Sequence, residues 1–259
     1  MTVVNRRIEF DLTYDMNFMA DVNTAKTLQH NGACEPEVVH LMRRVLREGD
    51  FAIDGGANIG FMTLVMSRLV GAQGHVEAFE PATVNFKKLR ANIELNRVEN
   101  VTAVQRALWG EDTAVTLHQG LDSGECSLMP VDNELVSTPC QALTLDRWCG
   151  AYDQAPRLLK LDIEGAELNA LMGAQALLTC GIDFISCELN EESLLKFGTS
   201  QADLRDFMAS KGYSTFVMSE AGERPSLVDR SMRVNAPRPS YHVLFSTEQK
   251  VHAAWAESI

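Results

Sequence analysis

The chain lacks an excess of positive charge and any long hydrophobic run. Its 259 residues include 23 Lys and Arg against 35 Asp and Glu, which gives a formal net charge of −12. Because nucleic-acid-binding surfaces are usually basic, this balance argues against a general DNA- or RNA-binding protein. The longest apolar stretch, residues 60–72, is too short to cross a bilayer and contains Arg68, so we expect no membrane partner.

Two further absences concern location and cysteine chemistry. Residues 1–15 contain no apolar segment of the kind that directs secretion, and we therefore expect a cytoplasmic protein. The six cysteines show neither C-x-x-C spacing nor the spacing of zinc ligands. This favours reduced thiols with a structural role over disulfides or a thiolate metal site.

Short apolar segments alternate with helical patterns along most of the chain. This alternation predicts an α/β fold built on a doubly wound, mostly parallel sheet. Helices are expected at 36–47, 61–70, 82–95, about 164–179 and 200–211. The seven expected strands cover 51–54, 75–80, 101–108, 158–163, 183–189, 214–218 and 241–246.

The ends of the chain and two loops fall outside this alternation. Residues 1–32 predict an N-terminal extension with a strand or hairpin, followed by the main domain at 33–259. Within that domain, residues 219–240 carry charges and prolines without a period and are a candidate lid. Together with residues 20–35 and 120–135, this segment is expected to contribute the pocket for a substrate. The extension could also pair across a homodimer.

The most informative local motif is the glycine-rich turn FAIDGGANIG at residues 51–60. An apolar strand ends in Asp54, and Gly55, Gly56 and Gly60 precede the next helix. Glycine has no Cβ, so the backbone can approach a ligand closely, and the helix N-terminus offers free N–H groups. The spacing is not the G-x-G-x-x-G of dinucleotide-binding proteins, and a carboxylate there would repel a pyrophosphate. The turn therefore favours a cationic ligand, and S-adenosylmethionine, with its sulfonium and ammonium groups, meets that description.

Carboxylates end four of the five strands expected to run parallel. Read in chain order, the residues at these strand ends are Asp54, Glu80, Ala107, Asp162 and Glu188. Ligands of open α/β sheets bind beyond the carboxyl ends of the strands. Acids are rarely buried there without partners, so we expect the four carboxylates to surround a ligand.

Individual residues near these strand ends have expected contacts with a nucleoside ligand. Glu80, followed by Pro81, is placed to accept hydrogen bonds from the ribose hydroxyls. Arg106 and Ala107 end the third strand, where an adenine ring would lie. Asn58 could position the carboxylate of the ligand or cap the following helix.

A second concentration of charge lies in LLKLDIEGAE, residues 158–167. Lys160 and Asp162 share one face of the strand because side chains alternate along it. In a reaction without metal, Lys160, Asp162 or Glu164 is the candidate base. Glu164 also has a simpler explanation, since an acid complements the N-terminus of the following helix.

A metal-assisted reaction is the alternative. Asp162, Glu188 and Asn190 end neighbouring strands and offer the oxygen ligands that Mg²⁺ prefers. Among the histidines, His242 is singled out because it lies at the start of the last strand, beside the candidate lid. A surface or core position is the simpler explanation for that histidine.

These motifs resemble those of the FkbM-type methyltransferases, which are class I, S-adenosylmethionine-dependent enzymes. The resemblance rests on FAIDGGANIG, the Glu80–Pro81 pair, TLDRWC at 144–149 and LKLDIEGAE at 159–167, and it covers about residues 33–218 and the last strand. It implies a Rossmann-like fold and methyl transfer to a hydroxyl of a sugar, polyketide or other small metabolite. By position, it places Asp54, Gly56, Asn58, Glu80 and Ala107 at the cofactor and Asp162 where methyl group and acceptor meet.

Other functions stay open at this point. A nicotinamide-dependent oxidoreductase shares the sheet, and a non-catalytic cofactor-binding protein would show the same motifs. The chain contains no Pro-Pro pair, which argues against the N-methyltransferases that carry one after the fourth strand.

Overall fold

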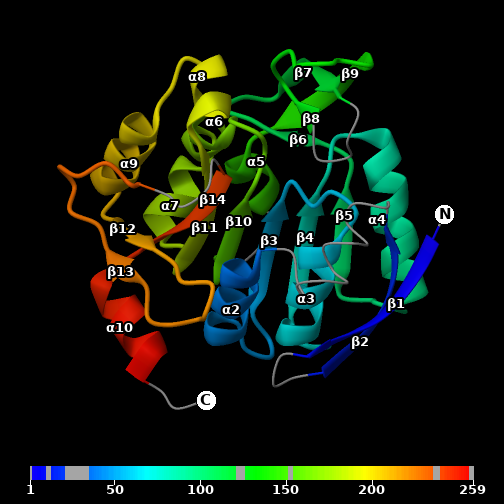
Figure 1. The fold of residues 1–259 in the computed structure, drawn as a ribbon, viewed down its shortest axis with the longest axis horizontal. Coiled ribbons are helices and arrows are strands. Elements are labelled where there is room, and N and C mark those ends of the chain that lie inside the picture. The colour runs from blue at the N-terminus through cyan, green and yellow to red at the C-terminus, as the bar shows by residue number, and fades with distance from the viewer. Residues whose placement is uncertain are drawn as a thin grey trace.

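The computed structural model describes residues 2–9, 13–20, 35–120, 126–150, 154–235 and 240–256, with the first two ranges described by their backbone. The strands form three sheets, of eight, four and two strands (Figure 1). None of the helices in these ranges is long and apolar enough to span a membrane.

The large sheet has the strand order β13-β12-β14-β11-β10-β3-β4-β5. Five neighbouring strands pair in parallel, and β14 pairs antiparallel with β11 and with β12. The parallel strands are β3 (Phe51–Gly55), β4 (His75–Phe79), β5 (Val101–Val104), β10 (Leu158–Leu161) and β11 (Phe184–Asn190). The others are β12 (Ser214–Val217), β13 (Ser226–Leu227) and β14 (Ser240–Ser246).

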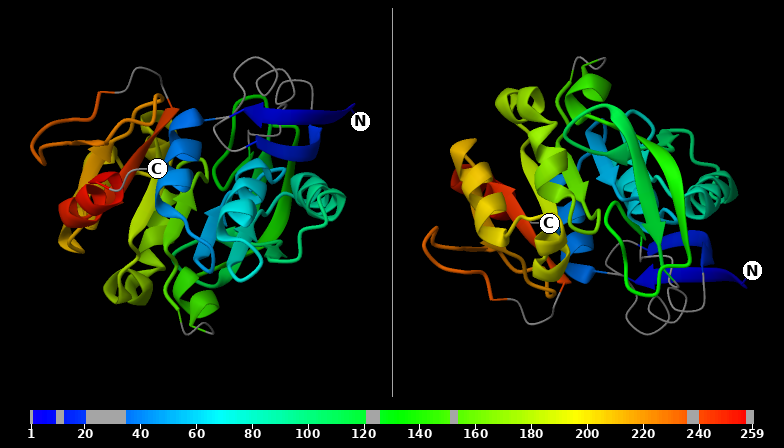
Figure 2. Two further views of the ribbon diagram at one scale, coloured as in Figure 1. Left: turned by 90° about the horizontal axis from the view of Figure 1, so that it is seen from below. Right: turned by 90° about the horizontal axis from the view of Figure 1, so that it is seen from above.

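Helices cover both faces of this sheet, as Figure 2 shows in views along its strands. Alternate residues of the strands are buried against opposite helical layers, so Ala52 and Ile53 belong to different core clusters. One layer contains α2 (Pro36–Val45), α3 (Phe61–Val70) and α10 (Glu248–Ala256). The other contains α5 (Leu145–Cys149), α6 (Glu167–Met172), α7 (Gln175–Cys180), α8 (Glu191–Lys196) and α9 (Gln201–Ser210). The predicted doubly wound α/β fold is thereby confirmed.

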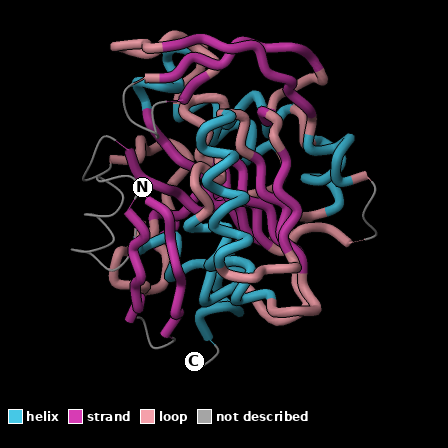
Figure 3. Tube along the Cα trace, turned by 90° about the vertical axis from the view of Figure 1, so that its right-hand side faces the viewer, coloured by secondary structure: helices cyan, strands magenta, loops and turns pink. Residues whose placement is uncertain are grey.

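The second sheet has the order β6-β9-β7-β8 and lies across the carboxyl ends of the central strands (Figures 1 and 3). Its strands are β6 (Ala107–Leu108), β7 (Thr113–Gln119), β8 (Cys126–Ser127) and β9 (Val136–Leu143). The single strand predicted at 101–108 is therefore wrong. The chain leaves the large sheet after Val104 and enters the small one at Ala107.

Three further details differ from the prediction. The large sheet has eight strands rather than seven, because β13 adds two residues beyond β12. The helix expected at 164–179 is two helices, α6 and α7, separated at Gly173. A Cβ on Gly173 would lie 2.3 Å from the carbonyl oxygen of Trp109, so this close approach requires glycine. The periodicity also missed the short helices α5 and α8 and the C-terminal helix α10.

The N-terminal extension contains an antiparallel hairpin of β1 (Thr2–Glu9) and β2 (Thr13–Ala20). Strand β2 lies beside α4 (Thr83–Leu95), which packs through Leu89 near β4. Residues 21–32 of the predicted extension lie outside the described residues.

Residues 229–234 of the candidate lid are anchored to the side of the sheet that carries α9, whereas Gly222 lies against His40 and Trp255 of the other helical layer. Val234 is buried, and its N–H donates to the side chain of Gln201 at 2.9 Å. The guanidinium of Arg205 donates to the carbonyl oxygens of Asp229, at 2.9 Å, and Met232. Residues 236–239 lie outside the described residues.

Candidate functional site

A cavity opens at the carboxyl ends of the parallel strands, between the large sheet and the small one. The small sheet contributes Leu108, Leu117 and Cys126 to its wall. Nine of the predicted site residues line it: Gly56, Asn58, Glu80, Pro81, Arg106, Ala107, Asp162, Glu164 and Glu188. Five others, Asp54, Gly55, Gly60, Lys160 and Asn190, lie outside the lining.

The turn after β3 brings backbone to the edge of this cavity. Gly56 has φ +76°, and a Cβ there would lie 1.8 Å from the carbonyl oxygen of Asp162. Asn58 also has a positive φ, of 49°, which is uncommon for a residue with a side chain. Its buried Oδ1 accepts no hydrogen bond from the part of the chain that the structure describes. A ligand with a hydrogen-bond donor would satisfy that oxygen.

The carboxyl group of Glu80 accepts hydrogen bonds from two backbone N–H groups, one of them in the same turn. Its Oε2 accepts from the N–H of Asn58 and its Oε1 from the N–H of Ala82, both at 2.8 Å. Burial raises the pKa of Glu80 to about 8, although both N–H groups act in the opposite direction. The carboxylate is thus fixed in place with lone pairs left for a ligand. Together with the unsatisfied Asn58 Oδ1, it fits the ribose and ammonium groups of S-adenosylmethionine.

Asp54 pairs with the buried ammonium of Lys160 and does not line the cavity. The Nζ of Lys160 lies 3.3 Å from Asp54 Oδ1 and 3.4 Å from Asp162 Oδ2, and it donates to the carbonyl oxygen of Gly56 at 3.1 Å. The hydroxyl of Thr63 donates to the other oxygen of Asp54 at 2.6 Å. Burial would lower the pKa of Lys160, but the carboxylates of Asp162 and Asp54 raise it overall. Lys160 therefore stays charged and balances two acids that were expected to face a ligand.

Asp162 lies between two cations at the end of β10. Burial would raise its pKa, but Lys160 and then His242 hold the pKa below its usual range. The carboxylate is therefore ionised, and a group so acidic is a poor proton acceptor.

Glu188 has a different environment on the neighbouring strand. Its Oε1 accepts from the hydroxyl of Ser240, and its buried Oε2 has no hydrogen-bond partner among the described residues. Burial first, and then the negative charges of Asp162 and two other acids, raise the pKa of Glu188 well above its usual value. Asn190 is occupied elsewhere, because its side chain caps α8 by accepting from the N–H of Ser193 at 3.2 Å.

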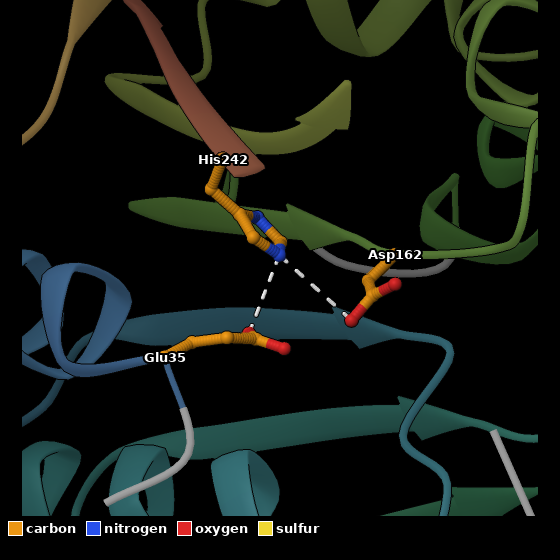
Figure 4. A group of neighbouring side chains, drawn as sticks. All are labelled: Glu35, Asp162 and His242. Atoms are coloured by element: carbon orange, nitrogen blue, oxygen red, sulfur yellow. Dashed lines mark ion pairs between the residues drawn. The ribbon is translucent and has the colours of Figure 1, made fainter. Parts of the chain in front are cut away.

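Sequence reasoning missed one cluster, which Figure 4 shows. The Nε2 of His242 lies 3.3 Å from Glu35 Oε2 and 3.8 Å from Asp162 Oδ2. Glu35 immediately precedes α2 and had no signal of its own. His242 was singled out by its position in the last strand, but nothing in the sequence pointed to its partners.

The fold and the acid-lined cavity are those of a Rossmann-like methyltransferase, and comparisons with known proteins agree. A model of the family "Methyltransferase FkbM domain" matches residues 54–215, more than half of the chain. "Methyltransferase 1" of Beauveria bassiana (strain ARSEF 2860) is 32% identical over 203 residues, which are 69% of this chain and 76% of that protein. The chain therefore belongs to the FkbM family of S-adenosylmethionine-dependent methyltransferases.

Solved structures of low sequence identity are also similar to this chain. "Methyltransferase FkbM" from Methylobacillus flagellatus KT matches with a TM-score of 0.49 and 20% identity, over 88% of this chain and 56% of that one. A putative methyltransferase from Streptococcus mutans, solved in complex with SAH, matches with a TM-score of 0.48 and 12% identity. That match covers 82% of this chain and 97% of the other.

Proposed function

We propose that the protein transfers a methyl group from S-adenosylmethionine to a hydroxyl of a small-molecule acceptor. The observation that carries this proposal is the continuity of one cavity from the fixed carboxyl group of Glu80 to half-buried Asp162 and buried Glu188. When bound, S-adenosylmethionine supplies a methyl group on a positively charged sulfur. The ionised carboxylate of Asp162 attracts that charge.

The cofactor end of the cavity is formed by residues that follow the first three parallel strands in the chain. Glu80 accepts hydrogen bonds from the ribose hydroxyls, as its fixed orientation allows. The free Oδ1 of Asn58 accepts from the ammonium group, and Gly56 lets the backbone come close. Arg106 and Ala107 flank the adenine ring.

The acceptor hydroxyl must lose a proton when its oxygen forms the new bond to carbon. Lys160 and Asp162 are engaged with each other, at 3.4 Å, and neither is suited to take that proton. Glu188 lines the cavity and has a buried oxygen without a partner in the described ranges. We therefore assign proton acceptance to the ionised form of Glu188, which its raised pKa makes the stronger base, and we assign orientation of the acceptor to Asp162 and Glu164.

Several features of the cavity bear on the class of acceptor. Its wall combines apolar side chains, among them Phe79, Leu117 and Leu128, with five acidic residues. This suits an uncharged or cationic organic molecule better than a phosphate-rich one. A sugar, polyketide or similar hydroxylated metabolite stays the proposed acceptor class, and a cytoplasmic location and a homodimer stay predictions.

The test is a screen of hydroxylated metabolites with S-adenosylmethionine, in which mass spectrometry detects the gain of one methyl group. Glu188→Gln should lower kcat by at least about 100-fold, the usual contribution of general base catalysis. Its affinity for S-adenosylmethionine, measured by calorimetry, should stay the same. Glu192→Gln, which changes an exposed acid on α8, is the matched control.

Two results would contradict the proposal. Binding of S-adenosylmethionine without methyl transfer to any hydroxyl would favour a non-catalytic cofactor-binding protein. Full activity of Glu188→Gln would remove Glu188 as the proton acceptor.

A further inference from the structure

We propose that Glu35, Asp162 and His242 form a binding site for a divalent first-row transition metal. One possible ligand atom from each residue lies within 4.8 Å of the other two. The distances from His242 Nε2 to the two carboxylate oxygens are 3.3 and 3.8 Å. Ligand atoms bound at about 2.1 Å, and at right angles, are about 3 Å apart, so a small closure would bring all three onto one ion.

The orientation of His242 is already that of a metal ligand, although an ion would first have to displace the proton that the carboxylates of Glu35 and Asp162 hold on the ring. Its Nδ1 lies 3.1 Å from the hydroxyl oxygen of Ser186 on the neighbouring strand, which leaves Nε2 facing the two carboxylates (Figure 4). Metal-binding histidines usually use their second ring nitrogen in this way, because the contact sets the tautomer and the direction of the ring. With 4% of its surface exposed, the side chain has little freedom to turn away.

An independent observation comes from Glu188, which lines the same cavity as Glu35 and Asp162. Glu188 is the register partner of His242 between β11 and β14, so both side chains lie on one face of the sheet. Its Oε2 is buried, and within the described residues nothing donates a hydrogen bond to it. A buried carboxylate oxygen without a partner is costly. A bound cation, or a water molecule on that cation, would satisfy it.

The backbone at Glu35 adds a further indication. Glu35 has φ 49° and ψ 69°, a left-handed conformation that is unfavourable for a residue with a side chain. Such strain is found at functional sites, where the surrounding structure maintains it. In this conformation the Glu35 side chain makes no capping hydrogen bond to α2, and its Oε2 lies 3.3 Å from His242 Nε2.

The donor set decides the class of metal. Mg²⁺ prefers oxygen ligands alone, whereas one imidazole with carboxylates suits Mn²⁺, Fe²⁺, Co²⁺ or Zn²⁺. The ligands therefore differ from the predicted set of Asp162, Glu188 and Asn190. A metal here would make an adjacent acceptor hydroxyl easier to deprotonate. That role rests on the proposed methyl transfer to oxygen, but metal binding does not.

The experiment measures metal binding without cofactor or acceptor, so its failure is separate from failure of the proposed function. Metal-free protein is titrated with Mn²⁺, and electron paramagnetic resonance follows the free ion. A parallel titration with Co²⁺ is followed by visible absorption. We expect one ion per chain, with affinity lowered at least about tenfold by Glu35→Gln and by His242→Gln. Circular dichroism checks that each variant folds.

A fallback reading and one control variant complete the design. If His242→Gln fails to fold, Glu35→Gln decides the question, because the Glu35 side chain is about one-third exposed and tolerates the change. The matched control is Glu134→Gln, which alters another carboxylate–histidine pair, Glu134 with His118 at 2.8 Å, where no third ligand joins among the residues that the structure describes. This control should bind Mn²⁺ like the wild type.

Three results would overturn the proposal. One is the absence of stoichiometric binding of both Mn²⁺ and Co²⁺. Another is equal affinity in Glu35→Gln and the wild type. The third is binding of Mg²⁺ as tight as that of Mn²⁺ and unchanged in His242→Gln, which would indicate an oxygen-only site.

Discussion

Replacing Lys160 by methionine should destabilise the fold strongly while keeping most of the side-chain volume. Lys160 is 3% exposed, and among the described residues its ammonium is the cation that pairs with Asp54, which is fully buried. Removing one partner of a buried ion pair typically costs about 3–5 kcal/mol, because the other charge is left uncompensated. The lost hydrogen bond to the carbonyl of Gly56 adds about 1 kcal/mol. For a chain of this size, we expect a fall in Tm of about 10 °C or more.

A second variant isolates the cause of this loss. Asp54→Asn removes the orphaned charge, and the amide oxygen still accepts from the hydroxyl of Thr63. The double variant Asp54→Asn/Lys160→Met should therefore recover at least half of the loss. The unpaired charge of Asp162 contributes less to the loss of stability in Lys160→Met, because His242 stays 3.8 Å from the Asp162 carboxylate.

Denaturant unfolding in the presence of a chelator measures these free energies. The control is Lys196→Met, which breaks an exposed pair with Glu192 at 3.8 Å and should change the free energy of unfolding by less than about 0.5 kcal/mol. If Lys160→Met lies within about 1 kcal/mol of the wild type, or if Asp54→Asn gives no recovery, the assigned role of Lys160 is wrong.

Three other predictions follow from the same structure. Gly56→Ala should disrupt the turn and abolish binding of S-adenosylmethionine. The control Gly49→Ala, at φ +90° with nothing within 4 Å of the added Cβ, should cost about 1–2 kcal/mol of stability and leave binding intact. Equal unfolding midpoints for the two variants would contradict this prediction. Free Glu80 holds its proton below about pH 8, and ribose hydroxyls require its charged form, so affinity should fall up to about tenfold per unit as the pH drops below 8. Calorimetry from pH 6 to 9 tests this, and Glu80→Gln should show no such dependence. Arg205→Ala should speed hydrogen exchange in residues 229–234 and leave cofactor affinity unchanged, since the guanidinium anchors that loop away from the cavity.

Local patterns predicted the central fold well. The strand, turn and helix of residues 51–70 follow from an apolar run, three glycines and a helical period, all within one short segment. The parallel strands and most long helices were predicted for the same reason, and the fold class and family are confirmed. The break after Val104 was missed because Ala107 and Leu108 are as apolar as the strand before them. Their partner in the second sheet, β9, lies much later in the chain.

The sequence by itself determined which residues gather at the carboxyl edge of the sheet, because parallel strands all end there and each terminal residue can be read from its strand. Only the tertiary structure decided how their charges are balanced. In the folded protein the ammonium of Lys160 lies beside Asp54, and Glu35 and His242, from opposite ends of the chain, lie beside Asp162. No sequence period relates residues so far apart, and side-chain direction within a crowded acidic edge depends on every neighbour at once.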